Sequence, residues 1–187
     1  MNTIGLPIDF SKVSGFAVDF AIDLAKKNGH RLSLIHALDF PIPMQDLYVT
    51  PTLMNEILEE SKKSSERELQ RVERRIKSDD IESRIIVLQG PLSEVISTIQ
   101  ESEVLDLIIM GTTGASGIKE VFIGSNTEKV IRNSRCPVLS IHRPTDINSL
   151  KTILVPTTTE HLNKKFMEML RSFSASIEAD KIHFLHV

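Results

Sequence analysis

The stretch DLIIMGTTGASGIKEVFIGSNT, residues 106–127, decides the fold. Residues 107–110 form a short apolar run of the kind that occupies a buried strand. Glycines punctuate the chain directly after this run, and residues 126–133 then follow a helical pattern. A strand that passes through a glycine-containing loop into a helix is the building unit of a parallel α/β sheet.

The same alternation extends to both sides of this stretch. Further strands are expected at residues 4–8, 31–38, 84–88 and 138–142. The helix between the first two strands ends at Asn28-Gly29, since glycine suits the left-handed residue that closes a helix. A long amphipathic helix is expected from about Thr52 to Lys77, and Gly90-Pro91 opens the next one. The inner side of the long helix is predicted to consist of Leu53, Ile57, Leu58, Leu69, Val72 and Ile76.

Composition narrows the class of protein. Of 187 residues, 41% are hydrophobic and 25% charged, and the net charge is −3, so a globular core fits and a nucleic-acid binder does not. The basic stretch from Arg71 to Lys77 also contains Glu73 and an apolar stripe, which favours a solvated helix face. Cys136 is the single cysteine, which excludes an internal disulfide and favours a buried structural thiol in a reducing compartment. No apolar run approaches membrane-spanning length, and a cytoplasmic protein is expected.

The C-terminal part repeats the pattern of the N-terminal part. Residues 153–156, ILVP, mirror residues 4–7, IGLP, and residues 182–186 mirror residues 32–36. We therefore expect a first domain at residues 1–143, a linker at residues 144–151 and an incomplete second copy at residues 152–187. Because a strand-helix-strand fragment cannot bury both faces of its sheet alone, it should dock on the first domain or another subunit, or be partly disordered.

The loop that begins at Gly111 carries the functional signal. Gly111, Gly114 and Gly124 permit positive φ angles and a close approach of the backbone to a ligand. The N–H groups at the start of the following helix favour an anion, and the hydroxyls of Ser125 and Thr127 add donors, a combination that suits phosphates. A structural alternative stands beside this interpretation, because Ser125 and Glu128 have the spacing of a capping box, which needs no ligand.

The glycines and Ser125 match the pattern G-x2-G-x9-G-[S/T], and on this pattern the chain resembles the ATP-binding members of the universal stress protein family. The resemblance covers residues 1 to about 143. It includes the PIDFS segment of residues 7–11, His36 at the end of the second strand, the DLIIM segment of residues 106–110 and the CPVL segment of residues 136–139.

The resemblance implies an α/β fold with a doubly wound, five-stranded parallel sheet of order 3-2-1-4-5 and a nucleotide at the switch point between strands 1 and 4. It implies an ATP site in which Gly111, Gly114, Gly124, Ser125 and Asn126 hold phosphates and ribose, with any Mg²⁺ bound through the phosphates. The remaining expected residues are Pro7, Ile8 and Asp9 on the adenine and ribose side, Ala37 against the base, Met110 nearby and Thr127 as a hydroxyl donor. One nucleotide site is expected, because the second copy has Thr158 in place of Asp9 and no glycine signature. A homodimer through the fifth strand or the partial second repeat is also implied.

Several of these residues have simpler interpretations. Asp9 is suited to capping the first helix, His36 and Met110 to packing in the core, and Asp106 to fixing the start of a strand. The chain has no Walker A lysine and no protein metal motif among its histidines. The leading hypothesis is therefore an ATP-binding stress or signalling module with little or no turnover. The alternative is a weak ATPase, or an enzyme that phosphorylates itself at Ser125 or Thr127.

Overall fold

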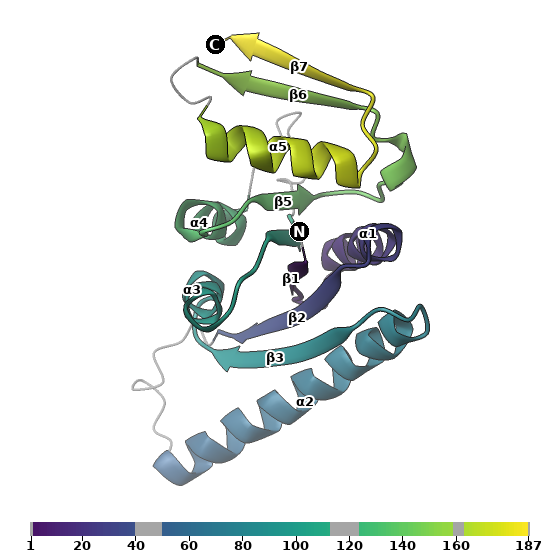
Figure 1. The fold of residues 1–187 in the computed structure, drawn as a ribbon. Coiled ribbons are helices and arrows are strands. Elements are labelled where there is room, and N and C mark those ends of the chain that lie inside the picture. Colours follow the sequence, from purple (N-terminus) through teal and green to yellow (C-terminus); the bar gives the residue numbers. More distant parts are fainter. Residues whose placement is uncertain (1, 40–49, 113–123, 159–162, 187) are drawn as a thin grey trace.

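The computed structural model describes residues 2–39, 50–112, 124–158 and 163–186, and these form two parallel sheets (Figure 1). The larger sheet has five strands in the order β3-β2-β1-β4-β5, as predicted, and every pair in it is parallel. Its strands are β1 (Thr3–Pro7), β2 (Arg31–Leu38), β3 (Ser83–Gln89), β4 (Leu107–Gly111) and β5 (Val138–Ile141). The fold is therefore a doubly wound α/β fold, and the order of its strands reverses between β1 and β4.

Helices cover both faces of the larger sheet. They are α1 (Lys12–Asn28), α2 (Pro51–Lys77), α3 (Leu92–Ser102) and α4 (Ser125–Asn133). One core cluster joins α1 and α2 to the sheet, and a second cluster joins α3 and α4 to its other face. Residues in β1 and β4 are buried on both sides, as expected of central parallel strands. The glycine prediction for α1 is confirmed, because Gly29 has φ 69° and its N–H bonds to the carbonyl of Ala25.

Helix α2 corrects one prediction. Leu69 and Ile76 are fully buried against the sheet, and Val72 packs beside them. Leu53 and Ile57, which were expected on the same inner side, are instead 45% and 40% exposed. Figure 1 shows the reason, because the N-terminal part of α2 extends beyond the edge of the sheet. Hydrophobic periodicity continues along the helix, but the sheet against which it would pack does not.

The C-terminal strands form a separate small sheet. After a 3-10 turn at Ile147–Ser149, β6 (Thr152–Thr157) and β7 (Lys181–His186) pair in parallel, with α5 (Lys164–Ser176) between them in the chain. Helix α5 lies between this sheet and β5 (Figure 1). Ile147 and Ile177 are buried in the same cluster as α1, and the Asn28 side-chain amide donates to the carbonyl of Ser176 at 2.9 Å. This unit is therefore packed against the rest of the chain rather than standing apart from it.

Candidate functional site

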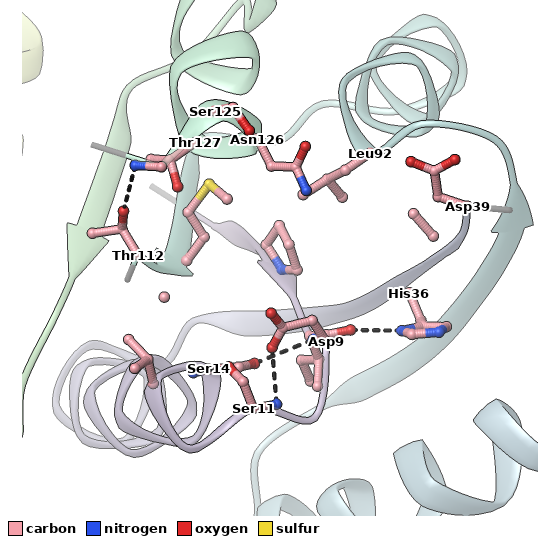
Figure 2. Close-up of a pocket in the computed structure, with 17 residues that line it drawn as sticks. Asp9, Ser11, Ser14, His36, Asp39, Leu92, Thr112, Ser125, Asn126 and Thr127 are labelled. Carbon is pink, nitrogen blue, oxygen red and sulfur yellow. Dashed lines mark hydrogen bonds between the residues drawn. The ribbon is translucent and has the colours of Figure 1, made fainter. Parts of the chain in front are cut away.

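A cavity of about 230 Å³ opens at the carboxyl ends of the parallel strands, at the switch point (Figure 2). The ends of β1, β2 and β4, the start of α4 and Leu92 of α3 contribute to its wall. Ten of the eleven residues expected from the sequence line this cavity, and they are Pro7, Ile8, Asp9, Ala37, Met110, Gly111, Gly124, Ser125, Asn126 and Thr127. Gly114, the eleventh, lies outside the described residues.

The first turn of α4 forms one side of the cavity. The helix begins at Ser125 with Gly124 as its N-cap residue, and no side chain of the described ranges caps it. The alternative interpretation as a capping box is therefore wrong. Ser125 is already inside the helix, and the Glu128 carboxylate accepts instead from Arg132 at 2.9 Å. The first turn of a helix leaves backbone N–H groups without intrahelical partners. With no capping side chain among the described residues, these donors lie at the cavity wall, and a helix start of this kind favours a negative charge.

Thr112 ties the two described ends of the glycine loop together. Its hydroxyl oxygen accepts from the Gly124 N–H at 3.2 Å, and its own N–H donates to the carbonyl of Ile141. Thr112 is buried, so this bond fixes the end of β4 against the start of α4 on the cavity wall. The sequence reasoning passed over Thr112, although it occupies one of the unspecified positions inside the glycine pattern.

Gly111 is a glycine for a packing reason. A Cβ atom at this position would lie 2.7 Å from the Ser14 nitrogen and 2.8 Å from backbone atoms of Val13. The end of β4 therefore touches the backbone of α1 directly, and no side chain fits between them. The expectation that these glycines adopt positive φ is wrong for the two that are described: Gly124 has φ −59°, and Gly111 is not among the positive-φ residues.

Asp9 lies across the cavity from Asn126 (Figure 2). The capping interpretation of Asp9 is wrong, because Ser11 is the N-cap of α1 and its side chain accepts from the Ser14 N–H. One carboxylate oxygen of Asp9 instead accepts from the Ser11 N–H at 2.9 Å, which holds the loop after β1 in a tight turn. The exposed carboxylate thus borders the cavity on the side opposite the α4 donors, where it can accept from hydroxyl or amino groups.

His36 forms part of the cavity wall and is half-buried, so the interpretation of it as a core residue is wrong. Its Nδ1 lies 2.7 Å from the carbonyl oxygen of Ile8. Because a carbonyl can only accept, Nδ1 carries the hydrogen in this contact. The ring of Phe10 contacts that of His36 in a tilted arrangement, with centroids 4.7 Å apart and the planes at 36°, so the loop after β1 is held to the end of β2.

Five further residues line the cavity without having been predicted, and they are Ser11, Val13, Ser14, Asp39 and Leu92. Ser11 and Ser14 are there because the start of α1 reaches the cavity, and the helix-start pattern could have revealed them. Leu92 is half-buried at the cavity wall. Asp39 follows β2 and is exposed, and nothing in its sequence context marks it.

Asp106 and Cys136 lie away from the cavity. Burial of the Asp106 carboxyl raises its pKa, but hydrogen bonds from the N–H groups of Asn2 and Thr3 outweigh this, so the pKa is lower than usual. Asp106 thus fixes the start of β1, a strand other than the one that it precedes in the sequence. Burial raises the pKa of the Cys136 thiol, whose sulfur also accepts from Gln100, and the protonated thiol is not an activated nucleophile.

Two searches of the described ranges bear on other kinds of site. Across residues 2–39, 50–112, 124–158 and 163–186, no group of three or more His, Cys, Asp or Glu side chains is arranged to hold a metal ion. Within the same ranges, none of the helices combines the length and apolar character that crossing a membrane requires.

The fold and this site define an α/β protein of the stress-protein type, and comparison with known proteins agrees. Residues 1–142 match the universal stress protein family, and the chain belongs to that family. The universal stress protein YxiE of Bacillus subtilis is 32% identical over 146 residues, which cover 75% of this chain and 98% of that protein.

Solved structures share the fold. A universal stress protein from Archaeoglobus fulgidus has a TM-score of 0.75 at 22% identity, and the match covers 99% of this chain and 66% of that one. A universal stress protein solved in complex with cAMP has a TM-score of 0.52 at 26% identity, covering 75% of this chain and 97% of that one.

Proposed function

We propose that this chain binds ATP in the cavity between β1 and β4 and acts as a nucleotide-dependent stress or signalling module with little turnover. The observation that carries the proposal is the first turn of α4, which lines the cavity and which no side chain in the described part of the chain caps. In this proposal the backbone N–H groups of Ser125, Asn126 and Thr127 receive the phosphates. Any Mg²⁺ arrives with the nucleotide, because the phosphates supply its ligands.

The two sides of the cavity suit the two ends of a nucleotide. The α4 side presents donors, and the opposite side presents the Asp9 carboxylate, which repels phosphate but accepts from ribose hydroxyls. Ala37 and Met110 supply the apolar wall that a base requires. The relative solved with cAMP supports an adenine nucleotide as the ligand class.

Burial disfavours one of the two candidate acceptors for self-phosphorylation. The hydroxyl of Thr127 belongs to a residue only 3% exposed, so a phosphate acceptor role there would require the helix start to open. Ser125 is exposed and remains the candidate for self-phosphorylation in the competing enzyme hypothesis. Incubation with γ-labelled ATP, followed by counting of released phosphate and labelled protein, separates the two hypotheses. Multiple turnovers, or label at Ser125, would favour the enzyme.

The proposed role of the backbone N–H groups in binding phosphates can be tested at Ser125 without disrupting helix α4. Ser125→Pro removes one N–H and the hydroxyl, and Ser125→Ala removes the hydroxyl alone. Proline fits the first helical position, and Gly124 already has φ −59° and ψ 149°, which the residue before a proline tolerates. In calorimetric titrations we expect Ser125→Pro to weaken ATP binding about tenfold and Ser125→Ala to have the smaller effect. Equal affinities for all three proteins, or no ATP binding by the folded wild type, would contradict the proposal.

Residues 152–187 are proposed to be the start of a second copy of the same domain, with residues 144–151 as the linker. The support is the shared strand-helix-strand order and the parallel pairing of β6 with β7, which repeats that of β1 with β2. Pairing of two chains through β5 or through this second unit remains a prediction, and α5 already lies next to β5.

A further inference from the structure

Helix α2 carries a second stripe of residues that the fold leaves open. Seven positions at alternating spacings of four and three form it, and they are Leu53, Ile57, Glu60, Ser64, Arg67, Arg71 and Arg74. Such spacing places all of them on one line along a helix, the seam of an antiparallel helix pair. All seven are exposed, whereas the buried side chains of α2 are Ser65, Leu69 and Ile76. We call this line the α2 seam.

Charge is unevenly divided along α2. Residues 51–60 contain three acidic residues and no basic one, whereas residues 67–77 contain five basic and two acidic ones. A helix with one acidic and one basic half is complementary to itself when two copies run antiparallel. Across a two-fold axis at Ser64, Glu60 meets Arg67 of the other copy, and Ile57 meets Arg71.

A groove lies where such a partner would place its apolar residues. The start of α1 and the C-terminal half of α2 form it, with Phe10, Phe16 and Val72 on its surface and Arg71 and Arg75 along its rim. Its volume is about 490 Å³. In the antiparallel arrangement, each residue lies opposite the one that is equally far from Ser64 on the other side. Leu53 therefore comes opposite Arg75 of the other copy and Ile57 opposite its Arg71, so both apolar side chains reach the groove that these arginines border.

Phe10 gives this groove an unusual apolar wall. Its side chain is 42% exposed and its φ is 62°, a left-handed conformation that a bulky residue adopts only with strain. A tilted contact with the His36 ring holds the Phe10 ring in place. Although one side of the Phe10 ring contacts His36, 42% of the side chain remains exposed beside the groove, so this part of it is open to a partner.

We propose that two copies of this chain associate through the α2 seam, antiparallel about Ser64, with Leu53 and Ile57 of each copy seated in the α1–α2 groove of the other. The charges at the rim are already partly engaged, since Arg71 pairs with Glu68 at 2.7 Å and Arg75 with Asp19 at 2.6 Å. Within the described residues, Arg67, Arg74 and Glu60 make no ion pair, so these side chains are available to a partner.

Charge reversal with rescue tests the register. In sedimentation velocity over a range of concentrations, Glu60→Arg and Arg67→Glu should each raise the dissociation constant of the dimer at least about tenfold. The double variant should restore most of the affinity, because it reverses the same pair. Glu59→Arg makes the same charge change beside the seam and should have the smaller effect. A wild-type chain that stays monomeric at high concentration, or single variants that leave association unchanged, would overturn the proposal.

A cross-link identifies the seam even where another surface also associates. In the full chain with Cys136→Ser, Ser64→Cys should form an intermolecular disulfide under mild oxidation, because the two-fold axis brings the two cysteines within bonding distance. Lys62→Cys, which is exposed on another side of α2, is the control and should cross-link far less. Equal cross-linking at both positions would refute the register. Circular dichroism establishes that each variant is folded.

Discussion

The chain contains two strand-helix-strand units with the same local design and different surroundings. The first, β1–α1–β2, lies in the middle of a five-stranded sheet and borders the cavity. The second, β6–α5–β7, pairs only with itself among the described residues, and its β6 residue Leu154 is 61% exposed. The strand-helix-strand unit alone therefore does not make a site. The site arises where β4 and the start of α4 come beside the end of β1.

One pair of positions shows the physical basis of this difference. Gly5 and Leu154 correspond in the two units, yet a Cβ at Gly5 would lie 2.9 Å from the Leu105 side chain, because β4 and its approach press against β1 there. Placing each residue at the other position gives the strongest test of this difference in packing. We expect Gly5→Leu to lower the free energy of unfolding by about 3 kcal/mol or more, since overpacking a tight core is strongly destabilising.

The matched change, Leu154→Gly, is expected to lower the free energy of unfolding by less than about 1.5 kcal/mol. Leu154 is largely exposed, so most of this loss comes from placing glycine in a strand. Urea unfolding monitored by circular dichroism measures both variants. Equal losses would mean that the two positions are packed alike and would contradict the comparison.

The second exchange concerns binding rather than stability. Asp9 corresponds to Thr158 in the second unit. We expect Asp9→Thr to weaken ATP binding by about tenfold or more, since a charged hydrogen bond contributes about 1.5–3 kcal/mol. Thr158→Asp should leave affinity and stoichiometry unchanged, because no β4 equivalent faces it in the described residues. Calorimetry that finds a second site in Thr158→Asp would show that the carboxylate alone specifies binding.

How far the sequence predicts the structure also differs between regions. The sheet order and the end of α1 at Gly29 are confirmed, because buried strands and glycine caps leave local patterns. Ten of the expected site residues lie around one cavity, and their role in binding stays a prediction. Leu53 and Ile57 were misplaced because periodicity marks an apolar stripe without showing where the sheet ends. Thr112 and His36 were missed or misassigned because their contacts are with residues distant in the sequence.

A third prediction concerns pH. The pKa of Asp106 is lowered in the folded chain, so its ionised form favours folding. This contribution is present above the ordinary pKa of aspartate, near 4, and is lost as the pH falls through the lower folded value. Asp106→Asn should remove it and lower the stability at pH 7 by about 1 kcal/mol. The difference between wild type and variant, followed by urea unfolding from pH 7 to pH 3, should shrink with falling pH. A constant difference would contradict the assignment to ionisation.

The smallest effect is expected where the two units touch. Lys27 of α1 and Glu178, just after α5, form an ion pair at 2.7 Å, and its hydrogen bond lowers the pKa of the Glu178 carboxyl. Because the Glu178 side chain is exposed, solvent and salt screen this ion pair. We therefore expect the two units to be held together mainly by the Asn28–Ser176 hydrogen bond and by the buried Ile177 side chain. Glu178→Gln should therefore leave hydrogen exchange in α5 unchanged at physiological salt, whereas Asn28→Ala should accelerate it. Faster exchange in Glu178→Gln than in Asn28→Ala would mean that the ion pair, rather than packing and the hydrogen bond, holds the two units together.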